Sequence, residues 1–220
     1  MTDDLKVVLI SGSFEYDSEE SLVILRDYLH ENVPARVDGS FRCQLVIFRH
    51  EEDTVSLRPV DDADVVVLFT RRLLTAGIEL DRFRRYCESG RPLVGLRTAS
   101  HGFQNWLALD RDVLGGNYDG HYGPGETTLV EIADGAEVHP VLMGVQPFEA
   151  YGSLYKNTPI AEDARLLLRG YTEQHTEPVA WTCERRSRVA YTSLGHQKDF
   201  WELDFLQLVE NSVLWAAGRT

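Results

Sequence analysis

The sequence has little cysteine, little positive charge and no long apolar run. Its 220 residues include only three cysteines, Cys43, Cys87 and Cys183, which form no C-x-x-C pair. This usage is typical of reduced thiols and predicts a cytoplasmic protein. The formal net charge of −13 would repel a nucleic-acid backbone or an anionic membrane surface, so we expect neither as a partner. No apolar stretch approaches the length of a membrane span, and the acidic start Met1-Thr2-Asp3-Asp4 is unlike a signal peptide.

Apolar runs and helical patterns alternate along the first half of the chain. Strands are predicted over 5–10, 43–48, 64–70 and 92–94, and helices over 17–33 and 78–89. This alternation predicts an α/β fold with a mostly parallel, doubly wound sheet. A length of 220 residues favours one domain spanning 1–220.

The second half has a different pattern. Five glycines between 115 and 125 predict an irregular loop. Strands are expected over 127–132 and 165–169, and a hairpin over 179–182 and 188–192 is expected to extend one edge of the sheet. A closing helix is predicted from about 199 to 217, with Phe205 and Val213 pointing inward.

The corner after the strand at 92–94 carries the strongest functional signal. It has the sequence Gly95-Leu96-Arg97-Thr98-Ala99-Ser100-His101 and precedes a segment that begins like a helix. In a nucleophile elbow, the position of Arg97 would hold Ser or Cys. A cation there predicts binding of an anion or a polarised oxygen. The alternative is that Arg97 pairs with a buried carboxylate.

The histidines also allow two interpretations each. His196 follows the last predicted strand and can transfer protons or be purely structural. His101 either faces the cleft or caps the corner helix, and His121 lies in the glycine-rich loop. These residues and His139 lack the spacing of metal ligands, so we predict no metal. No cofactor is predicted either.

Several motifs together resemble a known family. They are the corner itself, Gly115-Gly116-Asn117-Tyr118, His139-Pro140-Val141-Leu142-Met143-Gly144-Val145, and the stretch from Tyr191 to Trp215. This order is similar to the ThuA-like (trehalose utilisation) family of the class I glutamine-amidotransferase-like superfamily. The resemblance implies a flavodoxin-like three-layer sandwich and a link to carbohydrate metabolism.

The chain departs from the superfamily's amidotransferases at both catalytic motifs. Those enzymes carry a Gly-x-Cys-x-Gly elbow and a His-x-Glu pair, whereas this chain has Arg97 at the elbow and His196-Gln197-Lys198. Without a cysteine nucleophile, we expect no glutaminase activity.

These observations predict one polar site at the carboxyl edge of the sheet, because parallel strands joined by helices end at the same edge. We expect His196 and Arg97 to be catalytic, and a sugar-like ligand to be bound by further residues: His101, Arg71, Gly116, Asn117, Tyr118 and His121. The predicted function is acid–base chemistry on a sugar or keto-sugar derivative. The alternative is a non-catalytic domain that binds a small ligand or a protein partner. The sequence leaves the exact substrate and a homo-oligomer open.

Overall fold

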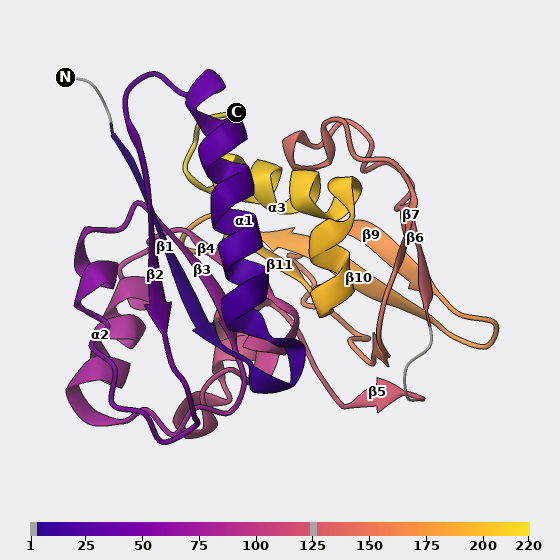
Figure 1. Cartoon of the computed structure of the whole chain (residues 1–220). Coiled ribbons are helices and arrows are strands. Elements are labelled where there is room, and N and C mark those ends of the chain that lie inside the picture. The colour runs from indigo at the N-terminus through magenta and orange to yellow at the C-terminus, as the bar shows by residue number, and fades with distance from the viewer. Residues whose placement is uncertain (1–3, 124–126) are drawn as a thin grey trace.

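A computed structural model of the protein describes residues 4–123 and 127–220 and shows an α/β fold built on a nine-stranded sheet (Figure 1). The strands of this sheet, in spatial order, are β2 (Phe41–Ile47), β1 (Leu5–Gly12), β3 (Val65–Thr70), β4 (Leu93–Leu96), β11 (Val189–Thr192), β10 (Thr176–Cys183), β9 (Arg165–Tyr171), β6 (Thr128–Ile132) and β7 (Phe148–Ala150). The first five are mutually parallel, and the remaining pairings are antiparallel. A separate two-stranded sheet pairs β5 (His121–Tyr122) with β8 (Leu154–Tyr155).

Helices cover both faces of the large sheet. The α-helices are α1 (Ser18–Asn32), α2 (Gly77–Glu88) and α3 (Leu203–Ala216). One apolar core joins α1 and α3 to one face, and the other joins α2 to the opposite face. Residues of β1 alternate between them, with Leu9 in the first core and Ile10 in the second. Burial on both faces explains why this strand is an almost continuous apolar run.

The expected α/β class and the large sheet are confirmed, but one local expectation is wrong. The hairpin of β10 and β11 does not form an edge of the sheet, because β11 adds a fifth parallel strand beside β4 and β10 continues into β9. The segment that begins like a helix after β4 is a short 3-10 helix, Arg97–His101. The hydrogen bond from Leu73 N to Gly102 O and the bridge between Leu73 and Phe103 end this turn, because they draw the chain into an extended conformation.

The loop and the closing helix also differ in detail. The glycine-rich loop contains the short strand β5, and part of it, 124–126, lies outside the described residues. The closing helix is split into a 3-10 helix, η8 (Gln197–Trp201), and α3. Among the described helices, none combines the length and the apolar character that a membrane span requires.

Candidate functional site

The corner after β4 is a strained elbow at the carboxyl edge of the sheet. Arg97 has a φ of +44°, in the left-handed region, which a non-glycine residue adopts at a cost of about 1–2 kcal/mol. Two hydrogen bonds hold it: Tyr191 donates its hydroxyl to the Arg97 carbonyl at 2.6 Å, and Thr98 donates to Ser13 Oγ at 2.9 Å. The loop after β1, the corner after β4 and the strand β11 therefore meet at this edge.

The Arg97 side chain is fully enclosed, with 1% of its surface exposed. Its Nη1 donates to the Ser193 carbonyl at 3.0 Å, and Nη2 donates to the Tyr16 hydroxyl at 3.2 Å and to the Ser153 carbonyl at 3.5 Å. The guanidinium carbon lies 4.4 Å from the ring centre of Tyr16 and 4.9 Å from that of Tyr155. Both distances are within the range of cation–π attraction.

This guanidinium has no carboxylate partner within ion-pair distance among residues 4–123 and 127–220. Its Nε is buried and finds no acceptor there. The salt bridge that the sequence left open is therefore not formed within the described chain. A buried charge that is only partly compensated is unfavourable for stability and is often found at functional sites.

His196 is half-buried at the start of η8. Its Nδ1 accepts a hydrogen bond from Lys198 N at 3.2 Å, while its own backbone N–H donates to Asp199 Oδ2 at 2.9 Å. Burial, and then the charges of Arg97 and Lys198, lower the pKa of His196 below its usual value. The imidazole is therefore neutral at pH 7 with its proton on Nε2, which makes Nε2 a hydrogen-bond donor.

The loop after β7 brings Arg97 and His196 to one place. A Cβ added at Gly152 would lie 2.6 Å from Arg97 Nη2 and 3.2 Å from His196 Cδ2. Gly152 also has a φ of +82°, so it is required here by both backbone conformation and space. The His196 ring centre lies 5.9 Å from that of Tyr16 and 6.2 Å from that of Tyr151.

His101 occupies the other side of the same aromatic cluster. It is 7% exposed and stacks on Tyr118 with ring centres 4.5 Å apart. The ring centres of Tyr155 and Tyr118 are 4.7 Å apart, and the Arg97 guanidinium packs over the Tyr155 ring. Tyr155 therefore contacts both Tyr118 and Arg97. Burial, followed by the charges of Arg72, Arg71 and Arg97, lowers the pKa of His101 to about 3.

The structure thus brings together some of the residues expected at the site and separates others. Arg97, His196, His101 and Tyr118 surround Tyr16 and Tyr155, and Arg71 lies at the rim in an ion pair with Glu15 at 3.3 Å. The remaining three expected residues lie elsewhere. Gly116 and Asn117 line a separate depression beside 159–163, and the His121 side chain is exposed beside the Gly123 carbonyl.

Sequence reasoning did not include Tyr16, Asp199 or Tyr155 among the expected site residues. Tyr16 comes four residues after β1, so the rule that loops at the carboxyl edge carry the site would have included it. Asp199 lies three residues after His196, which is the spacing of a capping box. Its carboxylate accepts from the backbone N–H groups of Tyr151, Gly195 and His196 and so fixes the His196 loop.

The corner offers neither a reactive thiol nor a metal-ligand set. Cys87 lies in α2, and Cys183 ends β10. Burial raises the pKa of all three thiols, to about 11 for Cys183 and to about 12 for Cys43. Within the described residues, no group of three or more His, Cys, Asp or Glu side chains is arranged to hold a metal ion.

Comparison with solved structures places this fold among ThuA-like proteins and glutamine amidotransferases. A putative ThuA-like protein from Parabacteroides merdae is 21% identical, with a TM-score of 0.75 over 98% of this chain and 90% of that one. A similar protein from Bacteroides uniformis is 20% identical, with a TM-score of 0.72 over 96% and 91%. A glutamine amidotransferase from Thermotoga maritima is 11% identical, with a TM-score of 0.55 over 97% and 98%. At these identities the likeness concerns the fold alone.

No curated protein matches the sequence. The family model described as ThuA, trehalose utilisation, matches residues 22–216. This match spans both the Arg97 corner and His196. The chain therefore belongs to the ThuA family.

Proposed function

We propose that the protein performs acid–base chemistry on a sugar or keto-sugar derivative without a cysteine nucleophile, and that it does so in the cytoplasm. The observation that carries this proposal is the neutral His196 imidazole, whose ring centre lies 5.9 Å from that of Tyr16, the residue whose hydroxyl accepts a hydrogen bond from Arg97. The family description, trehalose utilisation, supports a sugar as the ligand. We also propose that the fold is the flavodoxin-like, doubly wound arrangement that the sequence predicts.

His196 and Tyr16 supply the two hydrogen-bond donors of the proposed mechanism. Arg97 donates to the Tyr16 oxygen, so the Tyr16 proton is left to donate elsewhere. Together with His196 Nε2–H, it would bind a substrate carbonyl or hydroxyl oxygen and stabilise negative charge that develops there. Because Arg97 is enclosed, it acts through Tyr16 as a positioning residue.

Partly exposed aromatic rings around these donors suit a sugar. Tyr16, Tyr118 and Tyr151 each keep part of their surface open to solvent. Aromatic faces pack against the apolar faces of sugar rings, while the ring hydroxyls stay free for hydrogen bonds. Arg71 and His101 complete the proposed ligand-binding surface on the β3 side.

A non-catalytic ligand-binding domain is the second candidate, and one observation favours it. His196 already caps η8 through Nδ1, a structural role that needs no substrate.

The substitution His196→Asn separates the two functions. Asparagine is a good helix N-cap and keeps an acceptor for Lys198 N–H, but it removes the Nε2–H donor. If the protein is an enzyme, His196→Asn should leave the thermal midpoint unchanged and lower turnover by about 10²–10⁴-fold.

Turnover can be measured by NMR in D₂O as deuterium exchange beside the carbonyl of keto-sugars, with trehalose cleavage followed in parallel. His121→Asn is the matched control, because His121 is exposed and lies outside the cluster. Equal rates in the wild type and His196→Asn would overturn the role of His196. Sugar binding without any turnover by the wild type would support the non-catalytic candidate.

A further inference from the structure

Two consecutive arginines follow β3, and the second of them, Arg72, has no role in the mechanism above. Its backbone N–H donates to the His101 carbonyl at 2.8 Å. The side chain of Arg71 is held differently, by a 3.3 Å ion pair with Glu15, the residue before Tyr16. The two arginines therefore border the site on both its His101 side and its Tyr16 side.

Arg72 also has a strained backbone. Its φ is +50°, in the left-handed region that favours glycine. Within residues 4–123 and 127–220, the only other non-glycine residues with a positive φ are Asp17 and Arg97. The three follow β1, β3 and β4, which are neighbours in the sheet. Strained residues are often found at ligand sites, and all three lie at the carboxyl edge, where α/β sheets bind ligands.

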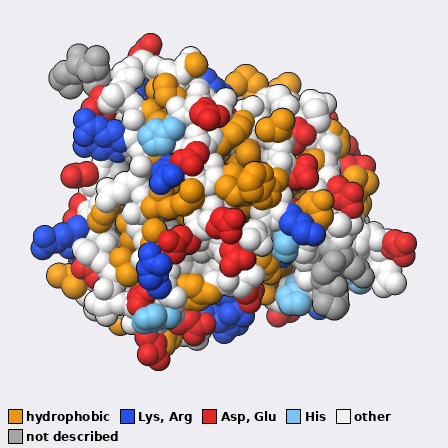
Figure 2. Space-filling view, viewed as in Figure 1, with side chains coloured by type: hydrophobic (Ala, Val, Ile, Leu, Met, Phe, Trp, Pro, Cys, Tyr) orange, Lys and Arg blue, Asp and Glu red, His pale blue; other side chains and the backbone are white. Residues whose placement is uncertain are grey.

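The local charge at this edge is positive, although the chain as a whole carries a net charge of −13. Figure 2 shows acidic side chains spread over the face that α1 crosses. Around His101 the balance is reversed. After burial, the causes that lower the pKa of His101 are the charges of Arg72, Arg71 and Arg97, with no carboxylate of the described chain among them. A ligand that carries negative charge is therefore attracted to this edge.

Both guanidinium groups are accessible to a ligand. Arg72 is exposed, and within the described chain it has no ion pair and one marginal hydrogen bond, from Nη1 to Gln104 Oε1 at 3.5 Å. The side chains of Arg71 and Glu15 are 34% and 45% exposed. A pair this exposed is weak, so a ligand anion can displace Glu15. Guanidinium groups bind carboxylates and phosphates through parallel N–H···O bonds, which identifies the chemistry of the ligand.

We propose that Arg71 and Arg72 form an anion site that binds a carboxylate or phosphate group of the ligand, so that the substrate is an acidic sugar whose ring lies against Tyr16 and Tyr118. This inference rests on the proposed function and narrows its substrate class. Trehalose is uncharged, so an acidic sugar goes beyond the family description. Glu15 occupies Arg71 in the free protein and is displaced by the ligand.

Calorimetric titration of the full chain with glucose, glucuronate and glucose 6-phosphate tests the anion site. The three sugars share one ring and differ in the group at C6, which is a hydroxyl, a carboxylate or a phosphate. With two arginine contacts, at least one acidic sugar should bind about tenfold more tightly than glucose in about 0.05 M salt. The acidic sugar that binds more tightly identifies the anion. Raising the salt to about 0.5 M should remove most of this advantage, because salt screens exposed charges.

Substitutions at the two arginines and at Glu15 locate the binding of the acidic sugar. Arg71→Gln and Arg72→Gln should each weaken it about three- to fivefold. Glu15→Gln should strengthen it several-fold, because Arg71 loses the carboxylate that competes with the ligand. The affinity for glucose and the thermal midpoint should stay the same in all three variants.

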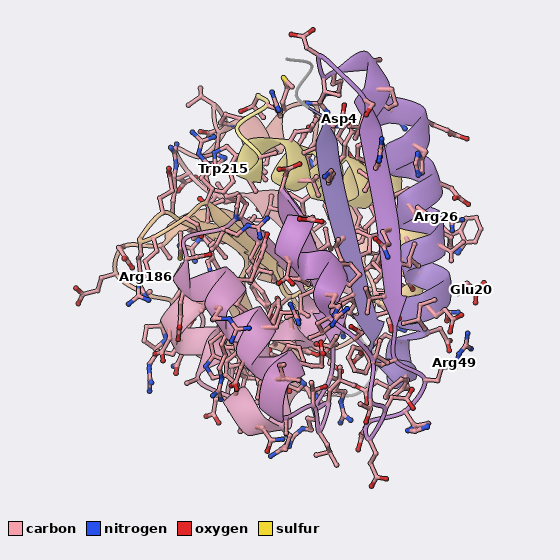
Figure 3. All side chains as sticks on the ribbon, turned by 90° about the vertical axis from the view of Figure 1, so that its left-hand side faces the viewer. Asp4, Glu20, Arg26, Arg49, Arg186 and Trp215 are labelled. Carbon is pink, nitrogen blue, oxygen red and sulfur yellow. The ribbon has the colours of Figure 1, made fainter. Side chains whose placement is uncertain are left out.

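The matched control is Arg186→Gln, which makes the same change at another exposed arginine without an ion pair in the described chain. Figure 3 shows Arg186 at the outside of the molecule. It precedes β11, a strand parallel to β4, and so lies at the edge of the sheet opposite to the site. Arg186→Gln should leave the affinity for all three sugars unchanged.

The outcomes separate this inference from the proposed function. If neither acidic sugar binds more tightly than glucose, or if Arg71→Gln and Arg72→Gln bind it as the wild type does, the anion site is wrong. The role of His196 is then unaffected, because it is measured by turnover of neutral keto-sugars. If the acidic sugar binds through the arginines while His196→Asn keeps full turnover, the anion site stands and the proposed mechanism fails. If Arg186→Gln weakens binding as much as Arg72→Gln, the assignment to Arg71 and Arg72 fails.

Discussion

Replacing Arg97 by methionine tests whether the buried guanidinium serves stability or function. Methionine is close in length and apolar, and it keeps a Cβ at the strained φ of +44°, so the backbone strain is the same. The change removes one good hydrogen bond to Ser193 O, a longer one to Tyr16 and a marginal one to Ser153. At about 1.5–3 kcal/mol for each of the two better bonds, the loss is about 3–6 kcal/mol.

The opposing gain is of similar size. The substitution relieves the burial of a charge that lacks a carboxylate partner within the described chain, and the desolvation of such an ion costs several kcal/mol. It also removes the buried Nε that has no acceptor there, an orphan that costs about 1–3 kcal/mol. The two sides nearly cancel, so Arg97→Met should change the free energy of unfolding by no more than about 2 kcal/mol.

Differential scanning calorimetry measures this balance. A chain of this length changes its Tm by about 2–4 °C per kcal/mol, so Arg97→Met should stay within about 8 °C of the wild type. Arg97→Ala also leaves a cavity, which costs a further 2–5 kcal/mol or so, and its Tm should fall roughly 10 °C lower still. Both variants should lose sugar turnover. If Arg97→Met falls as far as Arg97→Ala, the charge itself stabilises the fold and Arg97 is a structural residue.

Three further predictions concern other parts of the site. We expect no glutamine-dependent ammonia release, because Cys87 and Cys183 are buried, Cys43 is partly buried, and all three thiols have raised pKa values. Release that iodoacetamide abolishes would contradict the absence of a thiolate. The pKa of His101 is about 3 in the folded protein, below its usual value of about 6.5, so the fold favours the neutral imidazole. The free energy of unfolding is therefore highest above pH 6.5 and falls as the pH approaches 3, by about 2 kcal/mol at pH 5. His101→Asn should therefore flatten the dependence of Tm on pH, and an unchanged slope would refute this assignment. Gly152→Ala should lower both Tm and turnover, because its Cβ would displace Arg97 Nη2. Gly120 has a similar φ, but a Cβ there would meet no atom within 4 Å. Gly120→Ala should therefore lower Tm only by the cost of a Cβ at positive φ.

The sequence predicts the parallel half of the fold well, because its signals are local. The apolar run ending at Thr70 and the helix ending before Gly90 lie close to their expected bounds. The insertion of β11 beside β4 could not be predicted in this way. A hairpin pattern reveals that two strands pair with each other, but it does not reveal which further strand each will join.

The surroundings of Arg97 show a similar limit at the candidate site. Its position at the corner follows from the strand that precedes it. Its burial depends on Tyr155 and Gly152, more than 50 residues later, and on the direction of their side chains. Gly116 and Asn117 share a loop with Tyr118, yet they line a different surface, since sequence proximity does not set the direction in which a loop faces.

The late arrival of β11 has a consequence for how the protein is made. During translation, β1, β3 and β4 leave the ribosome early, but β4 cannot gain its second neighbour until residues 189–192 have been synthesised. The contact between Arg97 and Ser193 spans 96 positions. Until then the nascent chain exposes one open, apolar edge of its sheet, which is the kind of surface that chaperones protect from aggregation. We therefore expect chains truncated before β11 to be degraded or to aggregate instead of accumulating as a half-sized domain.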